Sequence, residues 1–196
     1  MCDLGDLADW RRVYRPCPVE SITGEGQRAL TERWLDAWRR RGGALPGRAD
    51  FLPEDMAPWL PSLCLYDCVA VAGRWRFRMR VQGSAIRDMD GGDFTGWFLD
   101  DLVVSHLRPV ILRDYACCVG RRLPCYTLRG VVNARGVDML FEKVLLPLAG
   151  GDGGLGFVLA CITTVDDCSE SFDLQDAGSR VRAMRGEFVV EPQPRA

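Results

Sequence analysis

Residues 75–99 constrain the fold of this chain more than any other stretch. Their first part, W-R-F-R-M-R-V at 75–81, alternates apolar side chains with arginines. This period of two is typical of a β-strand with one apolar face and one charged face. The second part breaks the alternation at Gly83 and continues as short helical pieces separated by glycines. The stretch therefore predicts a half-buried strand that leads directly into a compact, glycine-hinged helical segment.

The flanking sequence supplies the other elements of an α+β domain. Leu30, Trp34 and Trp38 recur at helical spacing and predict a helix over 27–41. The remaining expected elements are strands at 63–71, 74–82, 125–133, 137–148 and 155–165, a helix at about 100–119, and a short helix around 177–185. We therefore expect a five-stranded antiparallel sheet with a helical insert between the second and third strands, preceded by an N-terminal helix.

Four parts can be distinguished along the chain. We expect a lead-in over 1–26, a helical extension over 27–62, the α+β domain over 63–167 and a polar tail over 168–196. A chain of 196 residues is long enough to bury a real core. The expected place for a small ligand is a cavity between the sheet and the helical insert.

Charge and cysteine content bear on several classes of function. A net charge of −2 argues against bulk electrostatic binding to nucleic acid or to an anionic membrane. No segment is apolar for long enough to span a bilayer, and the N-terminus lacks the pattern of a signal peptide. We therefore expect a cytoplasmic protein whose nine cysteines are reduced. His106 is the only histidine and there is no C-x-x-C pair, so we expect no metal site.

A catalytic mechanism based on histidine would have to use His106. The sequence contains neither a G-x-S-x-G motif nor a phosphate-binding loop. We therefore expect that the chain is not an enzyme. An enzymatic or redox role would depend on His106 or on the Cys117–Cys118 pair. The corresponding test is whether an activity is lost when these residues are substituted.

Several segments carry a resemblance to a known family. They are W-R-F-R-M-R-V-Q-G-S at 75–84, G-G-D-F-T-G-W-F-L at 91–99, V-L-L-P-L at 144–148, R-A-D-F-L-P-E-D at 48–55 and L-P-S-L at 60–63. With the order of elements, they resemble a family of short, stand-alone PAS proteins of proteobacteria, common in alphaproteobacteria. The resemblance spans roughly residues 30–167. The chain departs from the pattern at Gln82, where an apolar residue is usual, and at Ser84, where threonine is usual.

The PAS resemblance implies a sensory, signal-transducing module that binds a small molecule. Flavin-binding light sensors carry Asn-Cys-Arg-Phe-Leu-Gln on the insert, which this chain lacks. Haem-binding sensors place a histidine on the long helix, and His106 lies near its expected start. We expect no cofactor, with haem at His106 as the alternative. Candidate cavity-lining residues, each of which could equally be an ordinary core residue, are Phe77, Met79, Ile86, Trp97, Leu107, Val110, Ile111, Phe141 and Phe157.

Two classes of function remain open. The first is a signal-input module, and because no kinase, helix-turn-helix or cyclase signature follows residue 167, we expect it to pass its signal by contact to another protein. The second is a constitutive homodimerisation or protein-interaction module with a filled core; neither involves nucleic acid or a membrane. Candidate interface residues are Leu30, Trp34, Trp38, Arg76 and Arg78. We expect the arginines to pair with Asp138 and Glu142 across the sheet, the alternative being a solvated charged face.

Overall fold

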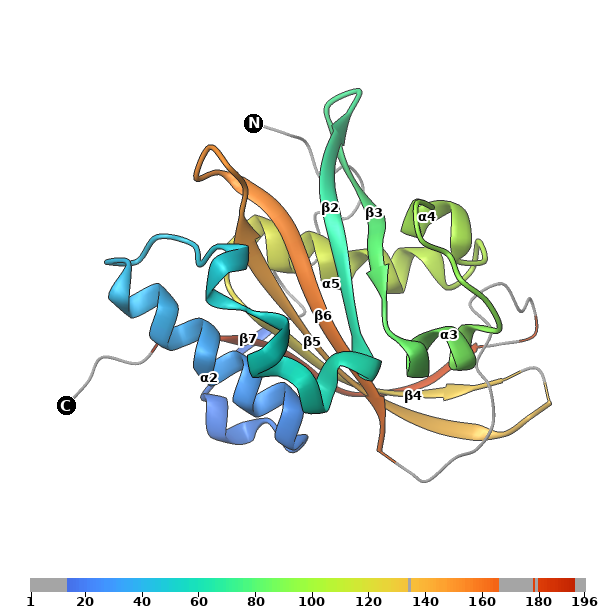
Figure 1. Ribbon diagram of the computed structural model, residues 1–196. Coiled ribbons are helices and arrows are strands. Elements are labelled where there is room, and N and C mark those ends of the chain that lie inside the picture. The colour runs from blue at the N-terminus through green and yellow to red at the C-terminus, as the bar shows by residue number, and fades with distance from the viewer. Residues whose placement is uncertain (1–13, 134, 166–177, 179, 193–196) are drawn as a thin grey trace.

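Figure 1 shows the computed structural model of the chain, which describes residues 14–133, 135–165, 178 and 180–192. The strands are β1 (Arg15–Cys17), β2 (Leu63–Val71), β3 (Arg74–Gln82), β4 (Cys125–Val132), β5 (Asp138–Ala149), β6 (Leu155–Thr164) and β7 (Arg180–Val190). The α-helices are α2 (Glu25–Arg40), α3 (Ser84–Asp90), α4 (Leu99–Leu102) and α5 (Arg108–Arg121), and the 3-10 helices are η2 (Val19–Ser21), η3 (Arg48–Asp50) and η4 (Pro53–Ser62). The strands form one sheet in the order β1-β7-β4-β5-β6-β2-β3.

Helices cover both faces of this sheet. Helices α3, α4 and α5 pack on one face, and α2 with η3 and η4 packs on the other (Figure 1). Strand β5 lies in the middle of the sheet and contributes to both cores. Leu145 belongs to the core under α5, whereas Val144 and Leu146 belong to the core under α2. This division follows from the alternation of side chains along a strand.

The fold class and the five expected strands are confirmed, and these strands are β2 to β6. The helix expected at about 100–119 is in two pieces, α4 and α5. Pro109 occupies the first turn of α5. A proline is tolerated there because its missing N–H would have no partner within the helix anyway. The last part of the helical insert is thus a separate helix, α5, which is followed by β4.

The prediction of a short helix around 177–185 is wrong, because strand β7 occupies Arg180–Val190. Strand β7 pairs antiparallel with β4, and β1 pairs parallel with β7. Without β7, the unpaired backbone groups of β4 would form an exposed sheet edge, so pairing outweighs a weak local helical pattern. Strand β1 and the start of α2 lie within the part expected as a lead-in. Residues 1–13 and 166–177 lie outside the described residues, and the division into four parts stays a prediction.

A β-bulge interrupts the alternation that dominates the sequence. Met79 lies opposite Tyr66 and Val81 lies opposite Leu65, so Arg80 is an extra residue in β3. A bulge of this kind reverses the two faces of the strand beyond it. Gln82 is therefore buried on the side of the helical insert, while Val81 is 51% exposed. The expectation that Val81 shares a face with Phe77 and Met79 is wrong for this reason.

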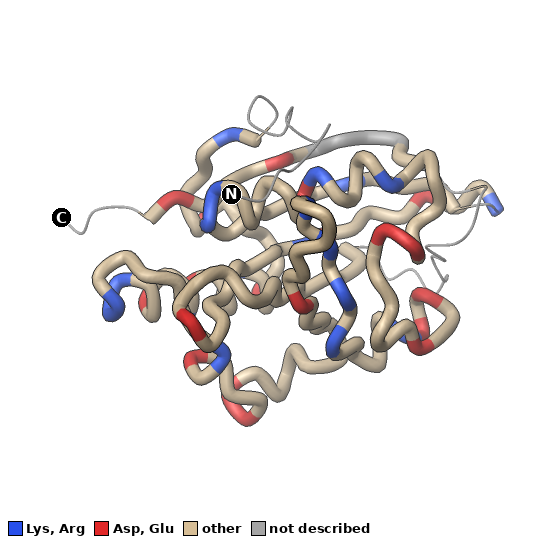
Figure 2. Tube along the Cα trace, turned by 90° about the horizontal axis from the view of Figure 1, so that it is seen from above, with Lys and Arg blue, Asp and Glu red and all other residues tan. Residues whose placement is uncertain are grey.

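Charges of both signs are distributed over many elements. Figure 2 shows blue and red segments interspersed along the described part of the chain. Within the described residues, no helix is both long enough and apolar enough to cross a membrane.

Candidate functional site: a cavity between the sheet and the helical insert

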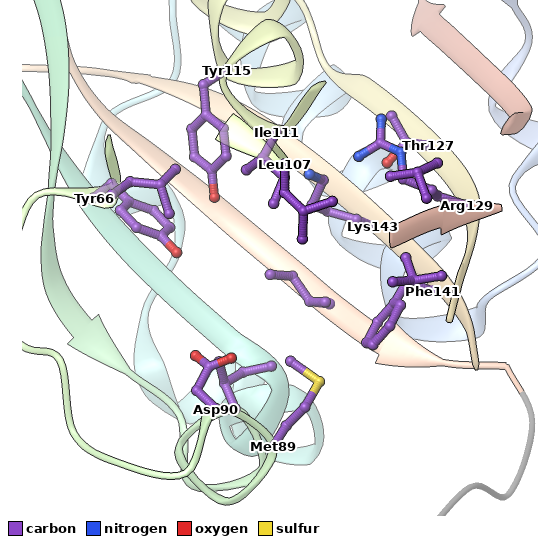
Figure 3. Close-up of a pocket in the computed structure, with 15 residues that line it drawn as sticks. Tyr66, Met89, Asp90, Leu107, Ile111, Tyr115, Thr127, Arg129, Phe141 and Lys143 are labelled. Atoms are coloured by element: carbon purple, nitrogen blue, oxygen red, sulfur yellow. The ribbon is translucent and has the colours of Figure 1, made fainter. Parts of the chain in front are cut away.

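A partly enclosed cavity of about 90 Å³ lies between the sheet and helices α3, α4 and α5. A water molecule's share of liquid volume is about 30 Å³, so roughly three waters would fit. Its walls are mostly apolar, and Figure 3 shows side chains entering it from the sheet, α3 and α5. The lining residues are Tyr66, Ile86, Met89, Asp90, Leu99, Leu107, Ile111, Tyr115, Thr127, Arg129, Val131, Phe141, Lys143, Ile162 and Val181.

Four of the nine residues expected to line the cavity do so. They are Ile86 from α3, Leu107 and Ile111 from the start of α5, and Phe141 from β5. Phe77 and Met79 are buried in the same core but do not reach the cavity. Phe77 instead packs against Tyr115, with 5.0 Å between ring centroids.

The other three expected residues lie elsewhere. Trp97 is 53% exposed, because its segment covers the edge of β3: its carbonyl accepts a hydrogen bond from Met79 N at 2.9 Å. Val110 is half-buried on α5 and does not line the cavity. Phe157 packs on the α2 side of the sheet, where Arg48 and Arg80 lie over its ring.

A buried cluster of charged side chains adjoins the cavity. Asp114, on α5, is fully buried. Its two oxygens accept hydrogen bonds from both terminal nitrogens of Arg129, each at 2.9 Å, from Lys143 Nζ at 2.5 Å and from the Tyr14 hydroxyl. The parallel pair of bonds to an arginine fixes both groups in one orientation. The cluster thus connects α5 to β4 and β5 at the cavity wall.

The C-terminal strand closes this cluster. Glu187 of β7 accepts a hydrogen bond from Arg113 at 2.7 Å and a longer one from Arg129 at 3.3 Å. Arg113 directly precedes Asp114 on α5, so the helix presents both a cation and an anion to the neighbouring strands. Strand β7 therefore completes the polar side of the site as well as the sheet.

The electrostatics of the cluster follow from burial and pairing. Burial alone would raise the pKa of Asp114, but the charges of Arg129 and Lys143 outweigh it and hold that pKa well below its ordinary value. For Lys143, burial is the larger effect and lowers the pKa of the amine in spite of Asp114. The Asp114 carboxylate is therefore strongly favoured in its ionised form, whereas the protonated form of Lys143 is disfavoured by its burial.

Two tyrosines and an aspartate supply further polar groups. The rings of Tyr66 and Tyr115 meet edge to face with centroids 5.2 Å apart, and burial raises the pKa of both hydroxyls. Asp90, at the end of α3, accepts a hydrogen bond from Gln82 Nε2 at 2.9 Å. The Oε1 atom of Gln82 accepts one from Phe94 N at 2.8 Å. Gln82 thus fastens α3 and the glycine-rich segment to β3, which explains why a polar residue stands here.

The face of α2 that was expected to include an interface is internal. Leu30 and Trp34 are fully buried, and Trp34 Nε1 donates to the carbonyl of Pro147 at 2.8 Å. Trp38 is half-buried and stacks on Trp34 with centroids 6.4 Å apart. The surface that the two tryptophans cover is therefore this chain's own sheet.

The expected pairing of the arginine stripe of β3, which consists of Arg76, Arg78 and Arg80, with Asp138 and Glu142 is wrong. Two strands, β6 and β2, separate β5 from β3 in the sheet. Arg76 instead pairs with Asp100 and Asp101, each at 2.8 Å, and lies over the ring of Phe98. Arg78 and Arg80 share Asp67 on the adjacent strand, at 3.0 and 3.4 Å. The stripe thus binds local carboxylates on β2 and α4.

A comparison with family models now adds to this geometry. The model described as "PAS domain" matches residues 23–163, which is well over half of the chain. The chain belongs to the PAS domain family. The match includes α2, so this helix is part of the region that the family shares.

Solved structures similar to this PAS domain are remote in sequence. A PAS domain of a protein from Colwellia psychrerythraea is 11% identical, with a TM-score of 0.43, covering 57% of this chain and 95% of that one. A fungal LOV domain photoreceptor is 13% identical, with a TM-score of 0.38, covering 53% and 75%. A sensory box histidine kinase/response regulator from Burkholderia thailandensis is 14% identical, with a TM-score of 0.37, covering 59% and 86%. No curated protein matches the chain.

The residues considered for haem or redox chemistry do not line the cavity of this PAS domain. His106 is exposed in the turn before α5 and does not line the cavity. A cavity of about 90 Å³ is also far smaller than the several hundred Å³ of typical small-molecule and cofactor sites, so it has room only for a very small ligand. Cys117 and Cys118 are buried, and burial raises the pKa of the Cys118 thiol. A raised pKa disfavours the reactive thiolate.

Sequence reasoning missed the cluster of charged residues that adjoins the cavity. Asp114, Arg129 and Lys143 come from three separate elements, and no spacing connects them. One available signal was Lys143, the only lysine of the chain, which begins the apolar run K-V-L-L-P-L. A lysine in such a strand needs a buried partner, and that requirement predicts a carboxylate nearby.

Proposed function

We infer that this PAS domain is a sensory input module that binds a small molecule in the cavity and signals to a protein partner. The single observation that supports this function is the position of β5. Strand β5 lines the cavity with Phe141 and Lys143. The residue between them, Glu142, points to the other face of the sheet and holds helix α2. Binding on one face of the sheet can therefore change contacts on the other. We propose no catalytic role for the chain.

The link from β5 to α2 is a set of short hydrogen bonds. Glu142 Oε1 accepts from Gly24 N at 2.6 Å, from the Thr23 hydroxyl at 2.9 Å and from the Tyr126 hydroxyl at 2.7 Å. Gly24 is the residue that precedes α2, so Glu142 caps the positive end of this helix. Further along, the carbonyl of Pro147 accepts the hydrogen bond from Trp34. The helix is thus fixed to β5 at two places.

A ligand acts through this link by shifting populations. It can change the position of α2 only if it binds more tightly to one arrangement of β5 than to another. Contacts with Phe141 and Lys143 provide such a difference in affinity. Any rotation of β5 that accommodates the ligand also moves Glu142, and with it the contact to α2. The partner, which is another protein or a second copy of this chain, would then recognise the altered α2 surface.

Filling the cavity tests ligand binding. We expect Ile111→Trp to remove the small molecule that the wild-type protein retains, because the indole would occupy the cavity. The measurement is native mass spectrometry of freshly purified protein, followed by extraction of the bound compound. Val110→Trp is the matched control, since Val110 is the neighbouring residue on α5 and does not line the cavity. A wild-type protein that carries no ligand would favour the constitutive interaction module instead.

Removing the charge of Glu142 tests the link. We expect Glu142→Gln to accelerate hydrogen exchange of the first-turn amides of α2 about tenfold or more, because hydrogen bonds to a charged group contribute about 1.5–3 kcal/mol. Glu32→Gln, on the exposed side of α2, is the control and should leave exchange unchanged. Equal exchange in Glu142→Gln and wild type would show that β5 does not hold the helix through this carboxylate.

A further inference from the structure

A groove lies on the face of the sheet opposite the cavity under the helical insert, beneath η3 and η4. Its volume is about 390 Å³. Small-molecule sites usually occupy about 300–1,000 Å³, so the groove falls within their range, whereas the cavity of about 90 Å³ does not. At the roughly 30 Å³ that a water molecule takes up in the liquid, the groove has room for about thirteen non-hydrogen atoms. It is the larger of the two hollows, and it has no part in the function proposed above.

The walls of the groove are apolar and come from both the sheet and the segment that covers it, which runs between α2 and β2 in Figure 1. Leu65 of β2 and Leu159 of β6 line it from the sheet, where they lie opposite each other. Leu52, Leu60 and Val81 also line it and are exposed. Three of the six large apolar side chains that are exposed among the described residues thus meet at one place. An apolar molecule in the groove would remove them from water, and the hydrophobic effect would favour its binding.

A cation stands at one end of this groove. Arg48 lines the groove, and its guanidinium carbon lies 5.4 Å from the centroid of the Phe157 ring. Phe157 and Leu159 point to the same face of β6, because they are two residues apart on the strand. Arg48 therefore marks the end of the groove nearest to Phe157. The guanidinium carbon of Arg80 lies 5.7 Å from the same ring centroid, so positive charge gathers at this end.

The carboxylate of Asp67 limits how much negative charge this end can accept. Asp67 lies opposite Phe157 in the pairing of β2 with β6, and it binds Arg78 and Arg80 at 3.0 and 3.4 Å. It would repel a ligand with two negative charges more strongly than a ligand with one. This favours a carboxylate, which carries one charge at pH 7, over a phosphate monoester, which carries nearly two. A carboxylate also matches the planar pair of donors that a guanidinium presents.

We propose that this groove binds a small amphipathic monocarboxylate of about ten to thirteen non-hydrogen atoms. Its carboxylate lies beside Arg48, and its apolar body lies along Leu65, Leu159 and Val81. The positive charge at the Arg48 end and a volume typical of small-molecule sites favour this occupant over a second protein. Ten non-hydrogen atoms need roughly 300 Å³ by the same measure, so such a molecule does not fit the cavity under the helical insert.

Octanoate and octanamide test the charge requirement, because they have the same number of non-hydrogen atoms and only octanoate is charged. We expect octanoate to bind the full chain about three- to tenfold more tightly, measured as Kd by isothermal titration calorimetry, since its hydrogen bonds to Arg48 are charge-assisted but partly exposed to solvent. In Arg48→Gln this ratio should fall toward one. Arg74→Gln is the matched control and should leave the ratio unchanged, because Arg74 is exposed on β3 and does not line the groove. Equal Kd values for the two compounds in the wild type would overturn the inference.

A second pair of variants tests the position of the ligand. Val81→Ser should weaken binding of both compounds at least threefold, because it removes part of the apolar wall. Val71→Ser is the matched control, since Val71 is exposed in the same hairpin and does not line the groove. Ile111→Trp should change neither Kd, because Ile111 lines the other cavity. Thermal unfolding checks that each variant is folded.

The outcomes separate this site from the proposed function and from a protein interface. If neither compound binds, or if Val81→Ser leaves both Kd values unchanged, the inference is wrong. Binding that Ile111→Trp abolishes would place the ligand under the helical insert, which supports the proposed function and overturns the groove site. A wild-type dimer that Val81→Ser dissociates and octanoate leaves intact, measured by sedimentation velocity, would make the groove an interface between two copies of the chain instead.

Discussion

Replacing Asp114 with asparagine is expected to lower the free energy of unfolding by about 3–5 kcal/mol, the usual cost of removing one partner from a buried ion pair. Asparagine has nearly the shape of aspartate, so the core packing would be kept. Lys143 would lose the carboxylate that it binds, and Arg129 would lose the nearer of its two carboxylates, both in a buried place. Urea denaturation of the full chain, followed by tryptophan fluorescence, measures the change.

The same substitution should remove part of the sensitivity to acid. The folded-state pKa of Asp114 is well below its ordinary value. Its contribution to stability is therefore present above the unfolded-state pKa and is lost as the pH falls from about 5 toward about 2. Wild-type stability should decline over that range, and the decline should be smaller in Asp114→Asn.

Two comparisons make this prediction specific. Glu54 is exposed, so Glu54→Gln should change the free energy of unfolding by no more than about 0.5 kcal/mol. Lys143→Met leaves Asp114 paired with Arg129 and should cost much less than Asp114→Asn. If Lys143→Met were as damaging as Asp114→Asn, the pairing of Asp114 with Arg129 would not be what holds the cluster together.

Much of the fold can be predicted because β2 to β6 carry strong local patterns. The strand boundaries follow from turn residues such as Ala72-Gly73, which lie between runs of apolar and β-branched residues. Strands β1 and β7 could not be predicted in this way. Their placement depends on the free edge of β4, and that edge exists only once the rest of the sheet has formed.

The cavity was predictable in part for a similar reason. On α5, the helical period places Leu107 and Ile111 on one face, and both line the cavity. Strand β6 reads L-G-F-V-L-A-C-I and is apolar on both faces, because helices cover both sides of the sheet. The pattern therefore could not show that Ile162 faces the cavity while Phe157 faces the α2 side.

The bulge at Arg80 shows how one extra residue changes the chemistry of the site. Up to Met79 the strand follows the pattern read from the sequence. Beyond the bulge, Gln82 rather than Val81 turns toward the helical insert and binds Asp90 and Phe94. A bulge is set by pairing with the neighbouring strand, so no period within β3 itself reveals it.

Gly83, next to this bulge, is the site of the second large expected effect. Its φ is −65°, which any residue can adopt, so backbone freedom is not the reason for glycine here. The reason is space: a Cβ atom at this position would lie 2.2 Å from the carbonyl oxygen of Pro61 and 2.5 Å from that of Leu60. The two chain segments are this close because Gly83 N donates to Leu63 O at 2.8 Å.

We therefore expect Gly83→Ala to lower the free energy of unfolding by about 3 kcal/mol, at the upper end of overpacking effects, because backbone cannot move aside as a flexible side chain would. For a chain of this size that corresponds to a fall in Tm of about 6–12 °C, measured by calorimetry. Gly151→Ala is the matched control, since a Cβ there meets nothing within 4 Å. An unchanged Tm in Gly83→Ala would mean that η4 can separate from the end of β3 at little cost. In that case the close approach of the two segments would not be what requires a glycine between the central hairpin and α3.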